Sequence, residues 1–337
     1  MPRHLPLSIL LALALCAPAA AQDDPDQDSD VPSLATSKAF VWLKGKQEAS
    51  GGWVAPEGRE VRTTGLVVLA YLGQGHTHRF GTYKRTVSQG LRRLKQLQMA
   101  DGSIGWEEKR PETILDHALA TMALCEAYAV TRDFTLKRYA EKAVAFALGQ
   151  GDPKAGWSRS AKGEADTLAT AWMTLALKAA KTAGLEVPSA AWERIRAHFA
   201  AVTDKAQRVG GFPGGKQETA DLPLGNAMAY LSRIFSGERR SELAPVLEPV
   251  LANLPAKGEA KLHQGYWFFA TYSAFQAGGK AWKTWSEALE PVLIGLQQED
   301  GAWAAAGPGK EDGDVYATAQ AVMTLVIWAR YIRMQQR

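Results

Sequence analysis

Cysteine is almost absent from this sequence of 337 residues, which contains only Cys16 and Cys125. Cys16 lies in an N-terminal segment that we expect to be removed, so the mature chain keeps a single cysteine. One cysteine excludes an internal disulfide and any metal site made only of cysteines. A phosphate-binding loop is lacking too, because the glycine-rich run 210–215 is not followed by the Lys-Ser/Thr pair of a P-loop.

An excess of charge of one sign is also missing. The formal net charge is +4, and it falls to +3 when Arg3, the only formally charged residue of the N-terminal segment, is removed. This balance does not indicate a nucleic-acid partner. No stretch alternates β-branched and polar residues for long, so we expect no sheet. We also expect no cofactor and no bound metal.

Long apolar runs are limited to the N-terminus. Arg3 precedes the apolar run 7–16, which is shorter than the ~18–20 residues that a spanning helix needs. Three alanines, 19–21, then stand where signal peptidase cuts. We therefore predict that residues 1–21 are a signal peptide, that the protein is exported to the periplasm or beyond, and that the mature chain has no transmembrane segment.

The rest of the chain divides into a short acidic segment and one large unit. Residues 22–33 contain five aspartates in their first nine positions, which is typical of a solvated, disordered tether. Residues 34–337 contain a repeat. Its clearest copies are the Gln-x-x-x-Gly-x-Trp frames 47–53 and 297–303. Weaker copies follow Gln98, Gln150 and Gln207, and their spacing of roughly 50 residues leaves room for a degenerate fifth copy near 258–264.

A second recurring feature supports six units. Each frame is followed by a polar residue and an Ala- and Leu-rich stretch, as in 166–177, which contains no charge after Asp166. The stretch before each frame has helical periodicity and carries charges, as in 137–142. An apolar helix is expected to be buried and a charged one to be exposed. We therefore predict an all-α ring of six inner and six outer helices, an α/α six-hairpin toroid.

This repeat resembles that of squalene and hopene cyclases and of protein prenyltransferase β-subunits. The resemblance covers roughly residues 35–335 and implies the terpenoid cyclase-like α/α toroid fold. It also implies that Gln47, Trp53, Gln297 and Trp303 fasten neighbouring units together and take no part in catalysis.

The catalytic motifs of those families are incomplete here. Hopene-type cyclases protonate an alkene with an Asp-x-Asp-Asp-Thr-Ala motif, of which only Asp166 and Thr167 remain, with Ala165 in place of the partner carboxylate. Asp166 is therefore our candidate acid. The zinc-binding Asp-x-Cys of prenyltransferases is absent, and so is a Gly-Cys-Gly-Glu-Gln thioester motif. Cys125 lies in an apolar stretch and is expected to be a buried small side chain.

Aspartates and histidines recur where the inner helices are expected to begin. We take Asp116, Asp166, Asp221 and Asp314 as equivalent positions on one rim. A ring of carboxylates at a cavity mouth could bind a cation or supply an acid, but Asp is also a common N-cap. His117 and His263 are placed on the same rim without a compact metal-ligand spacing.

Aromatic residues are the last candidate group. Trp172, Tyr266, Trp267 and Tyr316 are expected on inner helices, where they either line an apolar cavity or pack between helices. Three functions follow as hypotheses. The first is an exported toroid that binds an apolar or isoprenoid-like ligand, with or without catalysis; if it is an enzyme, we expect a cyclase-like or transferase-like one. The alternatives are a non-catalytic scaffold for a protein or cell-surface polymer at the ring rim, and a carbohydrate-active enzyme.

Overall fold

The computed structural model describes residues 30–160, 163–211, 223–256, 258, 262–307 and 309–327. Within these ranges the chain forms twelve α-helices and one short 3-10 helix, with no strand. The expected signal peptide lies outside the described residues. The first helix, α1, begins at Asp30, so the last four residues of the expected tether, 30–33, are helical. No helix in the described ranges is both long enough and apolar enough to cross a membrane.

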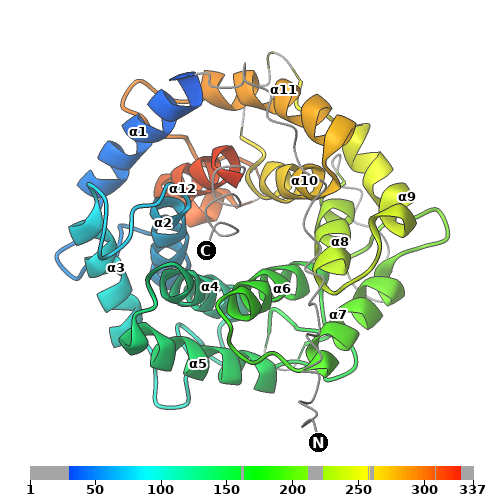
Figure 1. Ribbon diagram of the computed structural model, residues 1–337, viewed down its shortest axis with the longest axis horizontal. Helices are drawn as coiled ribbons and strands as arrows, with labels where there is room; N and C mark the ends of the chain where they lie inside the picture. The colour runs from blue at the N-terminus through cyan, green and yellow to red at the C-terminus, as the bar shows by residue number, and fades with distance from the viewer. Residues whose placement is uncertain are drawn as a thin grey trace, which may run out of the picture.

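The helices form two concentric rings, as the sequence predicts (Figure 1). They alternate strictly along the chain between the outer and the inner ring. The outer ring consists of α1 (Asp30–Gly45), α3 (Lys84–Gln96), α5 (Phe134–Gly149), α7 (Ser189–Val202), α9 (Arg240–Leu251) and α11 (Gly279–Gly295). The inner ring consists of α2 (Glu60–Gly73), α4 (Thr113–Thr131), α6 (Thr167–Thr182), α8 (Leu224–Phe235), α10 (Gln264–Ala277) and α12 (Gly313–Leu325). The 3-10 helix η1 (Lys310–Asp312) leads into α12.

The inner ring forms the core because its helices are apolar on every side. In α2 every residue from Val61 to Gly73 is buried, whereas α3 buries only one stripe and carries five Lys or Arg residues. Each inner helix packs on the next one, and α12 packs on α2, so the inner ring is closed. Close approach is needed where α2 meets α4. A Cβ at Gly65 would lie 2.9 Å from the carbonyl carbon of Leu119.

The Gln-x-x-x-Gly-x-Trp loops join neighbouring units, as the resemblance implied. Gln47 Nε2 donates hydrogen bonds to the carbonyl oxygens of Gly51, at 3.0 Å, and of Thr86 in the next outer helix, at 2.9 Å. Trp53 Nε1 donates to the Leu43 carbonyl at 2.7 Å. Gly51 has a φ of +93° and packs against the backbone of α3, where a side chain would meet the Gln89 oxygen. The motif therefore needs glycine for both its conformation and its space.

The last copy of the motif closes the ring on the first helix. Gln297 Nε2 donates to the Ala35 carbonyl of α1 at 2.8 Å, across 262 positions of sequence, and to Gly301 at 2.9 Å. Trp42 Nε1, also on α1, donates to Asp300 Oδ2 at 2.9 Å. Trp303 Nε1 donates to the Leu293 carbonyl at 2.7 Å, as Trp53 does in the first unit. The two ends of the repeat array are thus held by the same contact that joins its interior units.

Replacing Gln297 with alanine is expected to lower the free energy of unfolding by about 1–2 kcal/mol. The change removes two hydrogen bonds and leaves the Ala35 carbonyl without its side-chain donor. Chemical denaturation monitored by circular dichroism measures this loss. The neighbouring Gln298→Ala is the control, because the Gln298 side chain is exposed; it should change stability by less than about 0.5 kcal/mol. Equal effects of the two changes would contradict a closing role for Gln297.

Candidate functional site

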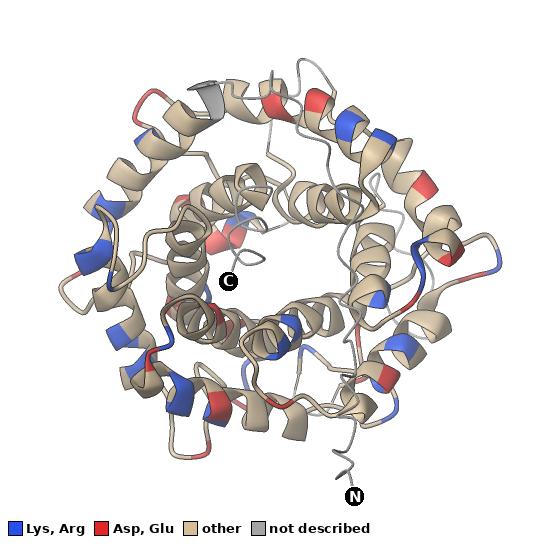
Figure 2. Ribbon diagram, in the orientation of Figure 1, with Lys and Arg blue, Asp and Glu red and all other residues tan. Residues whose placement is uncertain are grey.

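Charged side chains gather at one mouth of the ring, where the inner helices begin. The six inner helices run in the same direction, because each is followed by an outer helix that returns, so their N-termini share this mouth. Six residues from the starts of α2, α4 and α12 form what we call the arginine–carboxylate cluster: Arg59, Arg62, Arg110, Glu112, Asp116 and Asp312. Figure 2 shows charges of both signs inside the inner ring beside α2 and α12, whereas most other charges lie outside it.

Arg62 is the centre of this cluster. Its side chain is 3% exposed, and its Nε donates to Asp116 Oδ1 at 2.6 Å. Its Nη1 lies 3.3 Å from both Glu112 Oε2 and Asp312 Oδ1, and its Nη2 donates to the Glu112 carbonyl at 3.0 Å. One guanidinium therefore holds three carboxylates that belong to α4, the turn before it, and η1.

Two further arginines complete the charge balance. Arg59 Nη1 donates to Glu112 Oε2 at 2.8 Å, and its Nε lies 3.5 Å from Asp312 Oδ1. Arg110 Nη2 lies 3.3 Å from Asp116 Oδ2, although this contact lacks hydrogen-bond geometry. These three arginines and three carboxylates balance in charge when all six groups are ionised. A fourth arginine, Arg159, lies 3.9 Å from Glu112 Oε1 and 3.3 Å from Asp166 Oδ2, so it connects the cluster to Asp166.

The carboxyl groups of the cluster differ in acidity. Burial raises the pKa of Asp116 and of Asp312, and the neighbouring arginines only partly offset this rise. Burial acts the same way on Glu112, but the hydrogen bond from Arg59 and the charge of Arg62 together lower its pKa below the usual value. Glu112 and Asp312 share Arg62 Nη1, so their oxygens lie within twice 3.3 Å of each other. The mouth therefore holds neighbouring carboxyl groups whose pKa values move in opposite directions.

Several buried polar atoms near this mouth have no hydrogen-bond partner among the described residues. Gln264, the first residue of α10, leaves both atoms of its side-chain amide unpaired, although the residue is only 3% exposed. Other atoms without hydrogen-bond partners lie in the first turns of α2 and α4, in the loop before α4 and in the middle of α12: Thr63 Oγ1, Asp116 Oδ2, Arg110 Nε and Gln320 Oε1. Of these, Asp116 Oδ2 still has its ion pair with Arg110. An unpaired buried polar group costs about 1–3 kcal/mol. The set includes both donors and acceptors, so a ligand that satisfies it must offer both.

Aromatic side chains cross the ring at a deeper level. Trp172 on α6 stacks on Phe268 of α10, with ring centroids 5.3 Å apart and an interplanar angle of 11°. It also meets Phe269 edge-on at 5.1 Å. Helices α6 and α10 are not neighbours in the ring, because α8 lies between them. Trp172 therefore meets the α10 aromatic rings inside the inner ring, past α8, and fills part of the space in which an apolar ligand was expected.

Asp166 and Asp314 occupy equivalent positions, as the sequence predicted. Asp166 is the N-cap of α6, and its Oδ1 accepts from the Ala169 amide at 3.0 Å. Its Oδ2 accepts from the Arg159 amide at 2.9 Å. Asp314 Oδ1 accepts the corresponding bond from the Ala305 amide at 2.8 Å. Both oxygens of Asp166 are thus occupied by capping and loop contacts, and burial raises the pKa of its carboxyl group.

The equivalence predicted for Asp116 is wrong by one helical turn. In five of the six units the amide two residues after the loop glycine, or its counterpart, donates to the same inner-helix position. That position holds Thr64, His117, Thr170, Asn226 and Thr318. Asp166 lies four residues before this position, but Asp116 lies only one residue before it. Asp116 is therefore inside α4, does not cap it, and instead accepts from Arg62. Asp221 lies outside the described residues.

His117 connects α4 to the loop that precedes it and to the outer helix α5, within the wall of the ring. Its Nδ1 accepts from the Ile104 amide at 3.1 Å, and its Nε2 lies 3.0 Å from the Ala143 carbonyl, so the neutral ring donates from Nε2. His117 is fully buried, and burial lowers its pKa to about 4. His198 is likewise buried between units, with its pKa lowered to about 4. Neither histidine is directed towards the arginine–carboxylate cluster.

Of the remaining predicted residues, some lie in the wall of the ring and others at its mouth. Tyr266 donates from Oη to the Asn253 carbonyl at 2.9 Å, a contact with the loop after α9. His263 directly precedes α10 and packs edge-on against Trp267, with centroids 5.4 Å apart. Tyr316 faces the cluster, and burial next to Asp312 raises its pKa. In the described ranges no three His, Cys, Asp or Glu side chains are arranged to hold a metal ion.

Five residues of the cluster were missed by the sequence reasoning: Arg59, Arg62, Arg110, Glu112 and Asp312. The sequence nevertheless contains one indication of the cluster. Arg62 is the only charged residue between Val61 and Gly73, in a helix that is otherwise apolar. A single arginine in a buried helix needs carboxylate partners.

No protein-family model matches the sequence, and no curated protein matches it. Solved structures do match. The GH76 α-mannanase of Bacteroides thetaiotaomicron aligns with a TM-score of 0.65 at 13% identity, over 91% of this chain and 97% of the mannanase. The type II terpene cyclase MstE from Scytonema aligns with a TM-score of 0.61 at 14% identity, over 89% and 98%. An α-amylase from Clostridium perfringens aligns with 0.59 at 12% identity, over 88% and 97%.

The fold and these comparisons define the class of the protein. It is an α/α toroid of terpenoid cyclase-like architecture, as the resemblance of the repeat implied. The same architecture is shared by the mannanases, and identities of this size show the fold alone.

Acidification is expected to destabilise the fold through His117 and His198. Unfolded histidine takes up a proton at pH about 6.5, but these two do so only at about 4 when folded. Lowering the pH therefore favours the unfolded chain, by about 2 kcal/mol per histidine between pH 7 and pH 5. Urea denaturation at both pH values measures the change. His117→Asn should reduce the slope, and an unchanged slope would contradict a buried neutral imidazole.

Proposed function

We propose that the protein is carbohydrate-active and that a saccharide binds at the mouth of the ring that holds the arginine–carboxylate cluster. The observation that carries this proposal is the set of buried donors and acceptors that lack hydrogen-bond partners among the described residues, above all the two amide atoms of Gln264. Sugar hydroxyl groups donate and accept at once, so a saccharide can satisfy such a mixed set. An apolar chain would leave every one of these atoms unpaired.

The filled interior is the second reason for preferring a polar ligand. An isoprenoid needs a long apolar cavity, but the contact of Trp172 with Phe268 and Phe269 occupies the ring interior at that level. Similarity to the terpene cyclase and to the mannanase does not separate the two ligand classes, because the alignments are of nearly equal quality. The polar mouth and the aromatic interior are features of this chain itself.

The cluster also contains the chemical groups that glycoside cleavage requires. Most glycosidases use one protonated and one ionised carboxyl group, about 5–10 Å apart. Burial raises the pKa of Asp312, which suits a proton donor to the glycosidic oxygen. The lowered pKa of Glu112 keeps it ionised, so it can act as base or nucleophile at the anomeric carbon. Arg62 would orient both groups. The net reaction adds water across the glycosidic bond.

Removing either carboxyl group is expected to abolish hydrolysis without unfolding the protein. The assay is reducing-sugar release from a panel of polysaccharides that includes α-1,6-mannan and starch. Asp312→Asn and Glu112→Gln should each lower the rate by about 100-fold or more, as expected for loss of a general acid or base. Thermal denaturation of each variant separates this loss from a loss of folding.

Asp166→Asn is the matched control, because Asp166 is a buried carboxylate that is connected to the cluster only through Arg159. It should change stability through the N-cap, with little effect on the rate of the folded protein. A loss of activity in Asp166→Asn alone would move the acid to that residue, as the sequence motif suggested. Absence of hydrolysis and of binding across the whole panel would overturn the carbohydrate proposal.

The proposal includes an exported location, for which the expected signal peptide is the support. A mature N-terminus at Gln22, found by sequencing the protein purified from its host, is the expected result. The isoprenoid hypothesis is tested on the same sample by mass spectrometry of its organic extract. A stoichiometric isoprenoid in that extract would favour an apolar ligand over a saccharide.

A further inference from the structure

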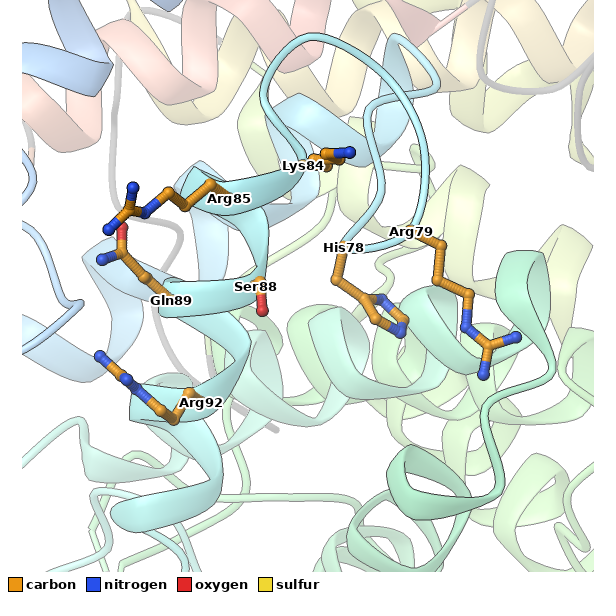
Figure 3. Close-up of a pocket in the computed structure, with 7 residues that line it drawn as sticks. All are labelled: His78, Arg79, Lys84, Arg85, Ser88, Gln89 and Arg92. Atoms are coloured by element: carbon orange, nitrogen blue, oxygen red, sulfur yellow. The ribbon is translucent and has the colours of Figure 1, made fainter.

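A second candidate site lies on the outside of the ring, away from the cluster. It is a surface pocket of about 590 Å³ between the loop that follows α2 and the outer helix α3. Figure 3 shows His78 and Arg79 on the loop side and Arg85, Gln89 and Arg92 on the helix side. Lys84 and Ser88 complete the lining. No carboxylate belongs to the lining, so the pocket is basic.

The cations on the helix side are free to bind an external anion. Lys84, Arg85 and Arg92 are exposed, and none of the three has an ion pair with another described residue. The loop side is already paired. His78 Nε2 lies 2.9 Å from Asp133 Oδ2, and Arg79 Nη2 lies 3.6 Å from the same oxygen. Because Asp133 already pairs with His78 and Arg79, it does not offset the positive charge of the exposed lysine and arginines of α3.

Two phenylalanines are exposed on the loops around this pocket. Phe80 is 63% exposed and Phe134 is 76% exposed. Both are held in place by fixed turns. The Phe80 amide donates to Thr77 Oγ1 at 2.9 Å. Phe134 follows Asp133, which caps α5 by accepting from the Thr135 amide at 2.9 Å. The His78–Asp133 contact joins the two loops, so both aromatic side chains belong to one surface.

The part of this surface that carries Phe80, Lys84, Arg85 and Phe134 faces away from the cluster, whereas Arg92 lies near the mouth, because its neighbour Arg93 pairs with Glu60 at the start of α2. The loops that carry Phe80 and Phe134 follow the C-terminal ends of α2 and α4, whereas the cluster lies at the N-terminal ends of the same helices. Free lysines and arginines with exposed aromatic residues beside them are the features of a surface that docks on a bilayer. The cations attract anionic headgroups, and the rings enter the boundary between headgroups and chains.

We propose that this basic and aromatic surface, made of Lys84, Arg85, Phe80 and Phe134, docks the ring on an anionic lipid membrane. The phosphate of a headgroup occupies the pocket between Arg79 and α3. Phe80 and Phe134 insert beside it. Docked in this way, the ring turns the mouth with the arginine–carboxylate cluster away from the bilayer and leaves it open to the solvent. The inference does not depend on what that mouth binds.

Vesicle sedimentation tests the proposal. The mature chain from Gln22 is mixed with vesicles of phosphatidylglycerol and phosphatidylcholine, or of phosphatidylcholine alone. Use of the mature chain avoids the apolar run 7–16, which would enter a bilayer by itself. We expect binding only to the vesicles that contain phosphatidylglycerol, and we expect it to weaken as salt is added. Equal binding to both kinds of vesicle, or binding to neither, would overturn the proposal.

Variants then assign the binding to this surface. The charge reversal Lys84→Glu with Arg85→Glu and the polar change Phe80→Ser with Phe134→Ser should each weaken binding by about tenfold or more. The matched control is Lys44→Glu with Lys205→Glu, two exposed lysines at the C-terminal ends of outer helices, on the opposite face. It should bind like the parent.

Two further outcomes would count against a membrane. A reversal variant that binds as well as the parent places the contact elsewhere. Full binding by Phe80→Ser with Phe134→Ser, together with displacement by a soluble anionic polysaccharide, identifies the pocket as a polyanion site. All sites changed in these variants are exposed, so thermal denaturation should show folded proteins of similar stability.

Discussion

Replacement of Arg62 by methionine is expected to lower the free energy of unfolding by about 3–5 kcal/mol, the cost of breaking a buried ion pair on one side only. Arg62 contacts Asp116, Glu112 and Asp312, and its own side chain is 3% exposed. Without the guanidinium, Asp116 keeps only Arg110 nearby. Methionine fills a similar volume, so the loss reports the charge more than a cavity. Urea denaturation at neutral pH measures it.

Arg208→Met is the control for this change. Arg208 forms an ion pair with Asp204 at 2.9 Å, but its side chain is 63% exposed, so its removal should cost less than about 1 kcal/mol. The double variant Arg62→Met with Asp116→Asn should recover part of the loss, because one uncompensated charge is removed. If Arg62→Met were as stable as Arg208→Met, the cluster would not be a buried charge network.

Trp172→Ala is the second change with a large expected effect, a loss of about 3–5 kcal/mol. Trp172 is 4% exposed and packs on Phe268 and Phe269 from across the ring. Its removal leaves an apolar cavity between α6 and α10. Cavities of this kind stay dry and bind small apolar molecules. The variant should therefore be stabilised by benzene, and the parent should not be.

Trp282→Ala tests whether the effect belongs to the interior. Trp282 lies on α11, is half-buried and contacts Phe275 at 5.3 Å, so its removal should cost less than that of Trp172. A loss below about 1 kcal/mol for Trp172→Ala would mean that this tryptophan lines an open space. The case for an apolar ligand in the ring would then be strengthened.

The ring was predictable because its contacts are local and repeated. Gln47 and Gln297 make the same pair of bonds in the first and last units, so the motif that marks a unit in the sequence is the contact that joins units in space. The division into buried and exposed helices followed from charge alone, as in α2 and α3. Even the degenerate fifth unit has its inner helix, α10, next to the expected position.

The site was less predictable, because its contacts join different units. Glu112, Arg62 and Asp312 are 50 to 250 positions apart, and no spacing rule relates them. The error at Asp116 has a simpler cause. The loop before α4 departs from the others, since α4 begins at Thr113 after the left-handed Glu112. An aspartate near a helix start was therefore taken for a cap, although it lies one turn inside the helix.

Gln264→Leu tests the central claim most directly, because the claim rests on polar atoms that lack hydrogen-bond partners among the described residues. Leucine is close in size to glutamine and removes both unpaired amide atoms. Saccharide-array binding and urea denaturation are measured on the same samples. The account predicts an unchanged or slightly higher free energy of unfolding, together with a loss of about tenfold or more in affinity for whichever saccharide the parent binds. A variant that is destabilised by more than about 2 kcal/mol would show that the amide already has partners. A stable variant with full saccharide affinity would contradict binding at this mouth.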